Sequence, residues 1–261
     1  MSKKLGLVLG AGGARGVAHI GFLQVLFENG IMPSCVSGAS AGSVVGACLG
    51  AGLTPEEMYS QIQNLKKGEV IEPLPKLSSN GLFSTKRVEQ KLRSVIGYKR
   101  ICDLSIDFCC VAADLISGEA KVFDGNYDTV KAITASSCIP GIFEPVTVGG
   151  RQYLDGGLLD RLPIDAIRRF EPDVIVAVDV FTRDSSKEEY KTVASVLGRA
   201  FELMDQENTE GKTTKEKPDL LVLPKLTGMS QYSFKNLDHA YFEGYQAGIE
   251  NIKEIKRLLE E

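Results

Sequence analysis

Short apolar runs alternate with helical patterns along most of this 261-residue chain. Runs of this length that are rich in branched residues and end at glycine or polar residues are typical of buried strands. The predicted strands are Leu5–Leu9, Ser34–Ser37, Phe108–Ala112, Val174–Val180 and Leu220–Leu223. Because helical patterns separate these strands, we predict a three-layer α/β/α fold, in which a mostly parallel central sheet has helices on both faces.

Several of the intervening segments carry helix signals. Ala14–Gly30 has apolar residues at helical spacing and ends at a glycine, which commonly terminates a helix. Thr54–Glu57 combines an N-cap threonine, a proline at the first helical position and a glutamate that completes a capping box. Further helices are predicted at Ser43–Leu49, from Ser84 or Thr85 to Ile96, at Val193–Asp205 and at Leu237–Leu259, with a β-hairpin turning at Gly149–Gly150.

The length of the chain is compatible with one domain, because α/β folds of this size commonly bury a single core. We therefore predict a single domain over residues 1–261, without internal repeats. Three polar stretches are predicted to be surface loops, and the alternative is a lid over a site. They are Lys66–Asn80, Arg183–Lys191 and Asp205–Asp219.

The balance of charge excludes some classes of partner. The formal net charge is −4 and no stripe of lysine and arginine is present, so we predict no nucleic-acid binding. This charge gives no bulk attraction to anionic lipid. The first residues resemble a signal peptide, but Gly12, Gly13 and Arg15 interrupt the apolar run and no convincing cleavage site follows. Because no apolar span approaches about 20 residues, we expect a cytoplasmic protein without a transmembrane helix.

The six cysteines do not have the spacing of a metal site. Cys109 and Cys110 are adjacent in a predicted strand, so their side chains should face opposite sides of the sheet. We predict no metal site, and we expect the cysteines to be free and buried. They are Cys35, Cys48, Cys102, Cys109, Cys110 and Cys138.

The sequence LGAGGARG, Leu9–Gly16, lies between the first predicted strand and the first predicted helix. Glycines allow several backbone N–H groups to converge, and the helix that follows adds positive potential. Such a loop suits a phosphate or the oxyanion of an acyl-transfer intermediate. A dinucleotide fingerprint would need glycine in place of Arg15, and a P-loop would need a lysine followed by serine or threonine. The alternative of a nucleotide-dependent oxidoreductase therefore depends on this loop alone.

The sequence CVSGASAGSVVGA, Cys35–Ala47, places Ser40 between a predicted strand and a predicted helix. A nucleophile on such a sharp turn needs small neighbours, and Gly38 and Gly42 flank the serine with one alanine on each side. Because the carboxyl ends of parallel strands meet at one edge of a sheet, Ser40 should lie beside the first glycine loop. The two loops would then supply backbone donors for an oxyanion.

A serine nucleophile needs a base, and three residues are candidates. His19 lies inside the first predicted helix, where packing or capping is the simpler interpretation. His239 permits the chain order Ser, Asp, His of an α/β-hydrolase triad, but its surroundings indicate the start of the last helix. Asp155 in YLDGGLLDRLP precedes Gly156 and Gly157, which would let another backbone approach closely. On this stretch alone, a simple turn aspartate is the more ordinary interpretation.

Three motifs in order, GAGGARG, GASAG and DGG, resemble the patatin-like phospholipase family of lipid acyl hydrolases. The stretches ADLISGE, ASSCIPGIFEPV and PDVIVAVDV are also similar to bacterial members. The resemblance extends over most of residues 5–180, and residues 181–261 are less typical. It implies a patatin-like fold and a serine esterase that acts on lipids or other acyl esters.

The resemblance also implies a serine–aspartate dyad without histidine. Ser40 would be the nucleophile that forms an acyl ester, and Asp155 the general base. The backbone that would bind the oxyanion belongs to Gly10, Gly12, Gly13, Arg15 and Gly16. No cofactor is implied, and the expected partner is a lipid or acyl-ester substrate, with transient peripheral membrane contact. Since a carboxylate with a pKa of about 4 is a weak base, the site should raise that pKa or transfer the proton in a concerted step.

One position departs from the family pattern. Members often carry asparagine shortly after the DGG motif, where this chain has Asp160 and Arg161. A second carboxylate near Asp155 would raise the pKa of that residue unless Arg161 neutralises it. We expect Arg161 or surface exposure to make Asp160 a bystander.

The alternative to an enzyme is a lipid-binding or regulatory protein with little turnover, but the intact motifs argue against it.

Overall fold

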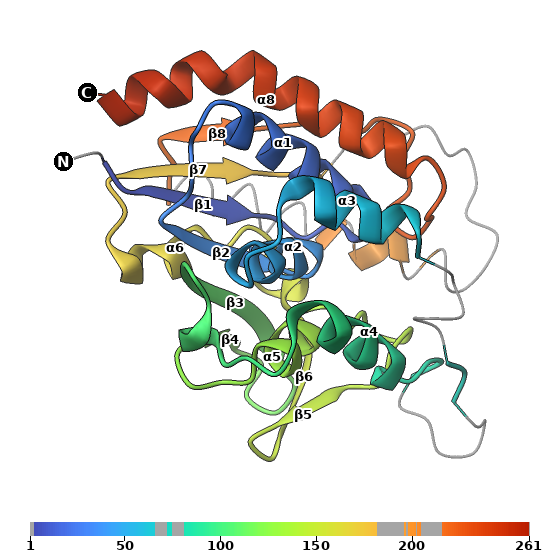
Figure 1. The fold of residues 1–261 in the computed structure, drawn as a ribbon. Helices are drawn as coiled ribbons and strands as arrows, with labels where there is room; N and C mark the ends of the chain where they lie inside the picture. Colours follow the sequence, from blue (N-terminus) through green and yellow to red (C-terminus); the bar gives the residue numbers. More distant parts are fainter. Residues whose placement is uncertain are drawn as a thin grey trace.

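The computed structural model describes residues 3–65, 72–74, 81–181, 196, 198–201, 203–204 and 216–260. Within these residues, an eight-stranded mixed sheet forms the centre of the molecule (Figure 1). Its strands are β1 Leu5–Leu9, β2 Cys35–Ala39, β3 Asp107–Asp114, β4 Ala120–Phe123, β5 Val146–Val148, β6 Arg151–Asp155, β7 Val174–Val178 and β8 Leu220–Val222. Their order is β5-β6-β3-β2-β1-β7-β8, and β4 also pairs with β3.

The strands β3, β2, β1, β7 and β8 are parallel to one another, whereas β4, β5 and β6 form the antiparallel pairs. β1 lies between β2 and β7, because Leu7 is in register with both Val36 and Val176. The chain therefore continues from β1 to β2 and β3 on one side and reaches β7 on the other. In such a sheet, the loops at the carboxyl ends of the strands beside this reversal form the usual binding crevice.

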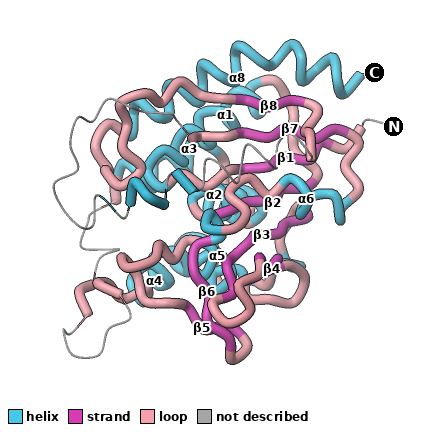
Figure 2. The backbone as a smooth tube through the Cα atoms, turned by 180° about the vertical axis from the view of Figure 1, so that it is seen from behind, coloured by secondary structure: helices cyan, strands magenta, loops and turns pink. Residues whose placement is uncertain are grey.

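Helices cover the two faces of the sheet unequally. One face carries α1 Val17–Glu28, α2 Ala41–Gly50, α3 Pro55–Gln63, α4 Lys86–Ile96, α5 Thr129–Ser136 and α8 Leu237–Glu260. The opposite face carries the short helix α6 Ile164–Ile167 (Figure 2). Side chains alternate along β1, so that Leu7 packs in the cluster with α1 and Val8 in the cluster with α6. The predicted layered α/β fold with a mostly parallel sheet is confirmed.

α8 lies along α1 (Figure 1). Residues 17–26 of α1 are all buried, because α1 is enclosed between the sheet and α8. A Cβ atom built on Gly21 would lie 2.0 Å from the carbonyl oxygen of Tyr241, and one built on Gly244 would lie 1.9 Å from that of Ala18. The two helices therefore meet backbone to backbone, at a separation that only glycine permits.

Local signals predicted most elements with small errors at their ends. The capping box is confirmed, because Thr54 and Glu57 each accept the other's backbone N–H. The helix expected from Ala14 starts with a 3-10 turn at Gly13–Gly16, and α2 begins at Ala41 rather than Ser43. The predicted hairpin is the β5–β6 pair. Most of the three polar stretches and much of the predicted helix Val193–Asp205 lie outside the described residues, which include only 72–74 and 216–219 of those stretches.

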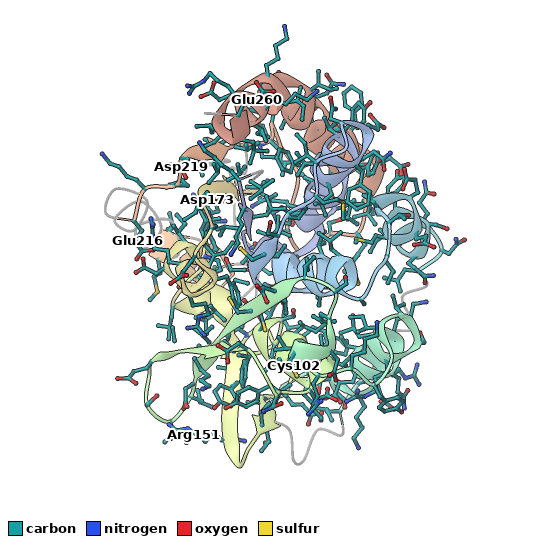
Figure 3. All side chains as sticks on the ribbon, turned by 60° about the vertical axis from the view of Figure 1, so that its left-hand side comes forward. Cys102, Arg151, Asp173, Glu216, Asp219 and Glu260 are labelled. Carbon is teal, nitrogen blue, oxygen red and sulfur yellow. The ribbon has the colours of Figure 1, made fainter. Side chains whose placement is uncertain are left out.

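The cysteines are free thiols, and all but one are buried. Cys109 and Cys110 belong to clusters on opposite faces of the sheet, as predicted. The burial expected for Cys102 is wrong, because this residue lies exposed in the 3-10 turn Ile101–Asp103 at the surface (Figure 3). In the part of the chain that the structure describes, no group of side chains is arranged to hold a metal ion. None of the described helices combines the length and apolar character needed to cross a bilayer.

Candidate active site

Ser40 occupies the turn between β2 and α2, where the backbone is strained. Its φ is 50° and its ψ is −123°, a conformation that L-residues rarely adopt. The turn is also crowded, because a Cβ atom on Gly42 would lie 2.1 Å from the carbonyl oxygen of Leu9. On Gly38 it would lie 2.6 Å from the backbone nitrogen of Ser43. The small residues that flank Ser40 are therefore a steric requirement of this turn.

Two neighbouring serines hold the strained turn in place. The backbone N–H of Ser40 donates to Ser136 Oγ at 3.0 Å, and its carbonyl oxygen accepts from Ser43 Oγ at 2.6 Å. Ser43 lies in the first turn of α2, whereas Ser136 is the last residue of α5. The sequence prediction did not single out Ser136, although the stretch ASSCIPGIFEPV that contains it was among those similar to the family.

The strain at Ser40 predicts an unusual order of stabilities. Ser40→Gly is expected to unfold with a free energy about 1 kcal/mol higher than Ser40→Ala, because glycine adopts this conformation without the Cβ clash. Both variants lose the same hydroxyl, so the difference between their free energies of unfolding reports the strain of the backbone at this position. Urea unfolding followed by circular dichroism measures it. Equal stabilities, or a more stable alanine variant, would show that the turn holds no strain.

The register of the sheet brings Asp155 to Ser40. β6 runs antiparallel to β3 and pairs Asp155 with Ala112, one residue beyond Val111, which pairs with the last residue of β2. Asp155 therefore ends its strand beside Ser40. Ser40 Oγ donates to Asp155 Oδ2 at 2.6 Å, and the N–H of Gly157 donates to Oδ1 at 2.8 Å. The second bond fixes the carboxylate with its other oxygen facing the serine.

Burial governs the proton affinity of this pair. Ser40 is 5% exposed and Asp155 is 7% exposed. Loss of hydration raises the pKa of Asp155 to about 6, although the hydrogen bonds from Ser40 and Gly157 act in the opposite direction. The carboxylate is therefore still mainly ionised at pH 7, and it is a stronger base than an exposed aspartate.

Asp160 lies differently from what the sequence suggested. Of the two alternatives given for Asp160, neutralisation by Arg161 or surface exposure, the second is wrong, because Asp160 is buried. Its backbone N–H donates to the carbonyl oxygen of Gly156, so the chain after the DGG motif makes a tight turn. The guanidinium of Arg161 pairs with Asp179. The higher pKa of Asp155 arises from desolvation, not from a second carboxylate.

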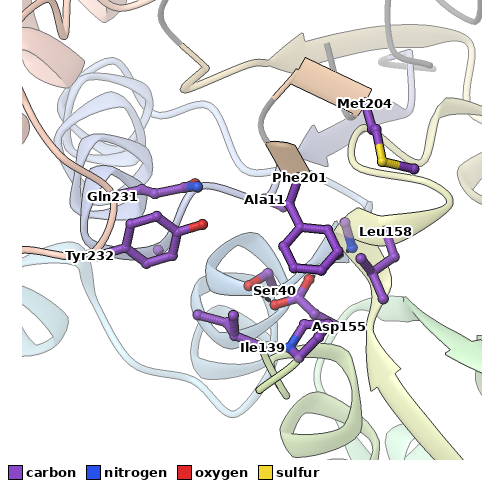
Figure 4. A pocket seen from close by; sticks show the side chains of 13 residues that line it. Ala11, Ser40, Ile139, Asp155, Leu158, Phe201, Met204, Gln231 and Tyr232 are labelled. Atoms are coloured by element: carbon purple, nitrogen blue, oxygen red, sulfur yellow. Dashed lines mark hydrogen bonds between the residues drawn. The ribbon is translucent and has the colours of Figure 1, made fainter. Parts of the chain in front are cut away.

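The glycine loop after β1 lies against both of the other motifs. A Cβ atom on Gly16 would lie 2.4 Å from that of Ala41, and one on Gly157 would lie 3.2 Å from that of Ala11. The GAGGARG, GASAG and DGG motifs therefore meet at one edge of the sheet, as predicted for the first two. Figure 4 shows Ala11, Ser40 and Asp155 close together in this region.

The hydrogen bonds of the glycine loop show which of its backbone N–H groups remain available to bind an anion. The N–H of Gly10 bonds the carbonyl oxygen of Val178, and the N–H of Arg15 bonds that of Gly12. Within the described residues, the N–H groups of Gly12, Gly13 and Ala41 have no acceptor. The Arg15 side chain is buried, and its Nε donates to the carbonyl oxygen of Met229. Three backbone amides near Ser40 are thus available to an oxyanion.

A cavity of about 110 Å³ opens over the serine–aspartate pair. Apolar side chains form much of its wall, with Leu158 and Ile139 near the pair and Phe201 above it (Figure 4). The full lining is Ala11, Gly12, Gly13, Ser40, Ile139, Pro140, Asp155, Gly157, Leu158, Phe201, Met204, Gln231 and Tyr232. An apolar group bound here would reach the Ser40 hydroxyl.

The two histidines lie apart from the serine–aspartate bond. His19 is fully buried, and loss of hydration lowers its pKa to about 4, so the ring is neutral at pH 7. Its Nε2 then donates to the carbonyl oxygen of Gly10 at 2.8 Å, which confirms the predicted packing role. His239 lies in the first turn of α8, with Nδ1 3.8 Å from Glu243 Oε1. It is not among the described residues that line the cavity.

The sheet is mostly parallel, and a strained serine lies between one of its strands and the following helix. This arrangement is typical of the α/β proteins that have a nucleophile elbow. Within this class, the model of one family, described as Patatin-like phospholipase, matches residues 7–168. The chain therefore belongs to the patatin-like phospholipase family.

Relatives with similar sequences are longer than this chain. An uncharacterized NTE family protein of Mycobacterium tuberculosis is 36% identical over 181 residues, which cover 69% of this chain and 49% of the relative. The lysophospholipase nte1 of Aspergillus niger is 26% identical over 284 residues, which cover 98% of this chain and 18% of the relative. The chain thus spans about half the length of the mycobacterial relative and much less of the fungal one.

A solved structure supports the fold independently of close sequence similarity. VipD from Legionella pneumophila superposes with a TM-score of 0.56 at 13% identity, and the match covers 97% of this chain and 67% of that one. The similarity extends over β8 and α8, well beyond the residues that the family model matches. The structural match therefore includes the described strand β8 and the described helix α8.

Proposed function

We propose that this protein hydrolyses carboxylic esters of lipids through an acyl ester on Ser40, with Asp155 as the general base. The observation that carries the proposal is the 2.6 Å hydrogen bond from Ser40 Oγ to Asp155 Oδ2 at the base of the cavity. Membership in the family and the apolar wall of the cavity support a lipid substrate. The lysophospholipase among the relatives is consistent with this substrate class.

In the first half of the reaction, Ser40 Oγ attacks the acyl carbonyl carbon while its proton passes to Asp155 Oδ2. The carbonyl oxygen gains negative charge, and the N–H groups of Gly12, Gly13 and Ala41 stabilise it. Collapse of this intermediate breaks the ester bond of the substrate. The departing alcohol takes the proton from Asp155, and the acyl group remains on Ser40.

In the second half, water replaces the alcohol. Asp155 accepts a proton from this water as its oxygen attacks the acyl-serine carbonyl, and the same amides stabilise the new oxyanion. The intermediate releases the carboxylic acid and returns the proton to Ser40 Oγ. Gly157 keeps the carboxylate oriented through both steps, because its N–H occupies the oxygen that faces away from the serine.

The acyl chain would lie against Ile139, Leu158 and Phe201, and the head group would face the open side of the cavity. Met204 lines the cavity and is 64% exposed, and the adjacent residue Leu203 is 49% exposed. We include transient contact with a membrane surface in the proposal, because these apolar side chains suit a lipid interface. Flotation with neutral phosphatidylcholine vesicles tests this part, and a protein that stays wholly in the lipid-free fraction would contradict it.

Labelling with a fluorophosphonate tests the chemical proposal. We expect the probe to modify Ser40 in the wild-type protein, with the modified peptide located by mass spectrometry. Ser40→Ala should not be labelled, whereas His239→Ala should be labelled at the wild-type rate because His239 lies outside the cavity. Loss of labelling in His239→Ala would replace the dyad with a triad. An unlabelled, folded wild type would instead favour the lipid-binding alternative.

A further inference from the structure

A buried arginine lies directly behind the glycine loop. The side chain of Arg161 is 2% exposed, and its Nη1 donates to the carbonyl oxygen of Ala11 at 3.2 Å. The backbone of the same residue accepts a hydrogen bond from the N–H of Ala11 at 2.9 Å. Arg161 therefore binds both polar backbone groups of the residue that immediately precedes Gly12.

The first of these contacts sets the direction of the Gly12 N–H group. In a planar trans peptide, the carbonyl of one residue and the N–H of the next point in opposite directions. Because the Ala11 carbonyl points to Arg161, the Gly12 N–H points away from Arg161. Gly12 lines the cavity with Ser40, and its N–H has no acceptor among the described residues.

The preceding peptide is held in the same way. The carbonyl oxygen of Gly10 accepts from His19, and the N–H of Ala11 points to the opposite side, toward Arg161. Two successive peptide planes are thus fixed by buried side chains. His19 fixes the peptide plane between Gly10 and Ala11. Arg161 fixes the next plane, between Ala11 and Gly12, which carries the Gly12 N–H.

Arg161 is itself held rigidly. Its Nη2 lies 2.6 Å from both carboxylate oxygens of Asp179, and its guanidinium stacks over the ring of Phe181 at 4.6 Å. One end of the guanidinium is therefore fixed on Asp179 while the other end reaches Ala11. A lysine carries all its donors on one nitrogen, so it can neutralise Asp179 but lacks the planar fork with which Arg161 holds Asp179 at one end and Ala11 at the other.

We propose that Arg161 is a positioning residue that aims the Gly12 N–H at the acyl oxygen in the transition state. The inference goes beyond the proposed ester hydrolysis and rests on it. Arg161 contacts the loop from behind, so its removal should weaken stabilisation of the oxyanion without changing the binding of the intact ester.

The test is Arg161→Lys, assayed with a p-nitrophenyl ester and normalised to the concentration of reactive Ser40. We expect kcat to fall by roughly 10- to 100-fold, because small misplacement of a catalytic donor has effects of this size. KM should stay within about twofold, since the change acts after substrate binding. An alkyl trifluoromethyl ketone, which adds to the serine as a tetrahedral oxyanion, should bind more weakly in proportion to the loss of kcat/KM. A non-hydrolysable ether analogue should bind as before.

Arg93→Lys is the matched control. Arg93 also makes two hydrogen bonds to one carboxylate, that of Asp128, and it stacks over Tyr98 at 4.6 Å. The same change there should leave kcat and the affinity for the ketone at wild-type values. This control shows the effect of removing a stacked, doubly bonded arginine away from the glycine loop, and unchanged binding of the ether analogue by Arg161→Lys would show that the substrate pocket itself is intact.

A second variant covers the case in which Arg161→Lys does not fold. The double variant Arg161→Met/Asp179→Asn removes both charges, and the asparagine can still accept the N–H of Phe181 that Asp179 now binds. It should show the same loss of kcat. An unchanged kcat in either folded variant would overturn the inference while the esterase proposal stands. Absence of turnover in the wild type would remove both.

Discussion

Asp155→Asn is expected to lower kcat for ester hydrolysis by about 10⁴-fold, because an amide cannot accept the proton of Ser40. Asparagine has nearly the same shape, and its oxygen can still accept the N–H of Gly157. The loss would therefore report the missing base rather than a disturbed turn. Steady-state kinetics with a p-nitrophenyl ester measures it. Asp160→Asn is the matched control, since Asp160 is also buried and follows within the same turn, and it should retain wild-type kcat.

The same substitution should make the protein more stable at neutral pH. The pKa of Asp155 is about 6 in the folded state and 3.8 in the reference state, so the folded state holds a proton that the unfolded state has released between these values. The unfolding free energy of the wild type therefore falls as the pH rises from about 4 to 6. Relative to the wild type, Asp155→Asn should gain roughly 2–3 kcal/mol across this window, since one pKa unit corresponds to about 1.4 kcal/mol. Urea unfolding at several pH values measures this gain, and a difference that does not vary with pH would contradict it.

The pH dependence of ester hydrolysis should follow the ionisation of Asp155. Because only the carboxylate form of Asp155 accepts the serine proton, kcat/KM of the wild type is expected to rise with pH around a midpoint of about 6. His239→Ala should leave this midpoint unchanged. A midpoint near 4 would mean that burial does not shift the pKa of Asp155 in the free enzyme.

Gly244→Ala is expected to destabilise the fold strongly at a position away from the site. Its new methyl group would lie 1.9 Å from the carbonyl oxygen of Ala18, so α8 would have to move away from α1. We expect a loss of about 3 kcal/mol, at the upper end of the cost of overpacking, even though alanine favours the helix itself. Thermal and urea unfolding measure this loss.

Gly248→Ala is the matched control, one turn further along α8. A Cβ atom there would lie 2.7 Å from two side-chain carbons of Val25, and a side chain can shift more easily than a backbone carbonyl. Both variants gain the same helix propensity, so their difference measures the backbone contact. Equal losses in the two variants would show that the helices are not held at the Gly244 contact.

The features that the sequence predicted well are those encoded within a few residues. Apolar runs rich in valine and leucine gave the parallel strands, and the capping box at Thr54 identified the start of α3. α5 and α6 were not predicted. α6 is only four residues long, and neither helix begins with a capping box of the kind at Thr54. β4 was also missed, because its pairing with β3 depends on the antiparallel return of the chain.

In the candidate site, too, the sequence predicted the features encoded within a few residues and missed those that depend on distant segments. The strained turn at Ser40 follows from its small neighbours, and the resemblance to the family indicated Asp155. Ser136 and Asp179 were not identified, because each acquires its partner only when distant segments meet. Ser136 lies 96 positions from the amide that it binds. Surface exposure was one of the two alternatives for Asp160, but this residue is buried, and no pattern within a few residues of it indicates that burial.

The contact between α1 and α8 also has a consequence for synthesis on the ribosome. α1 and the glycine loop leave the exit tunnel more than 200 residues before α8, and β1 appears long before its partner β7. Until those later segments emerge, the apolar faces of α1 have no cover, and exposed apolar surface of this kind makes a nascent chain prone to aggregation. The loop also lacks the carbonyl oxygens of Val178 and Gln231 that its amides bind in the folded protein. A growing chain therefore contains Ser40 and Asp155 well before it has a finished site, and α8 completes the environment of α1 only after both residues have emerged.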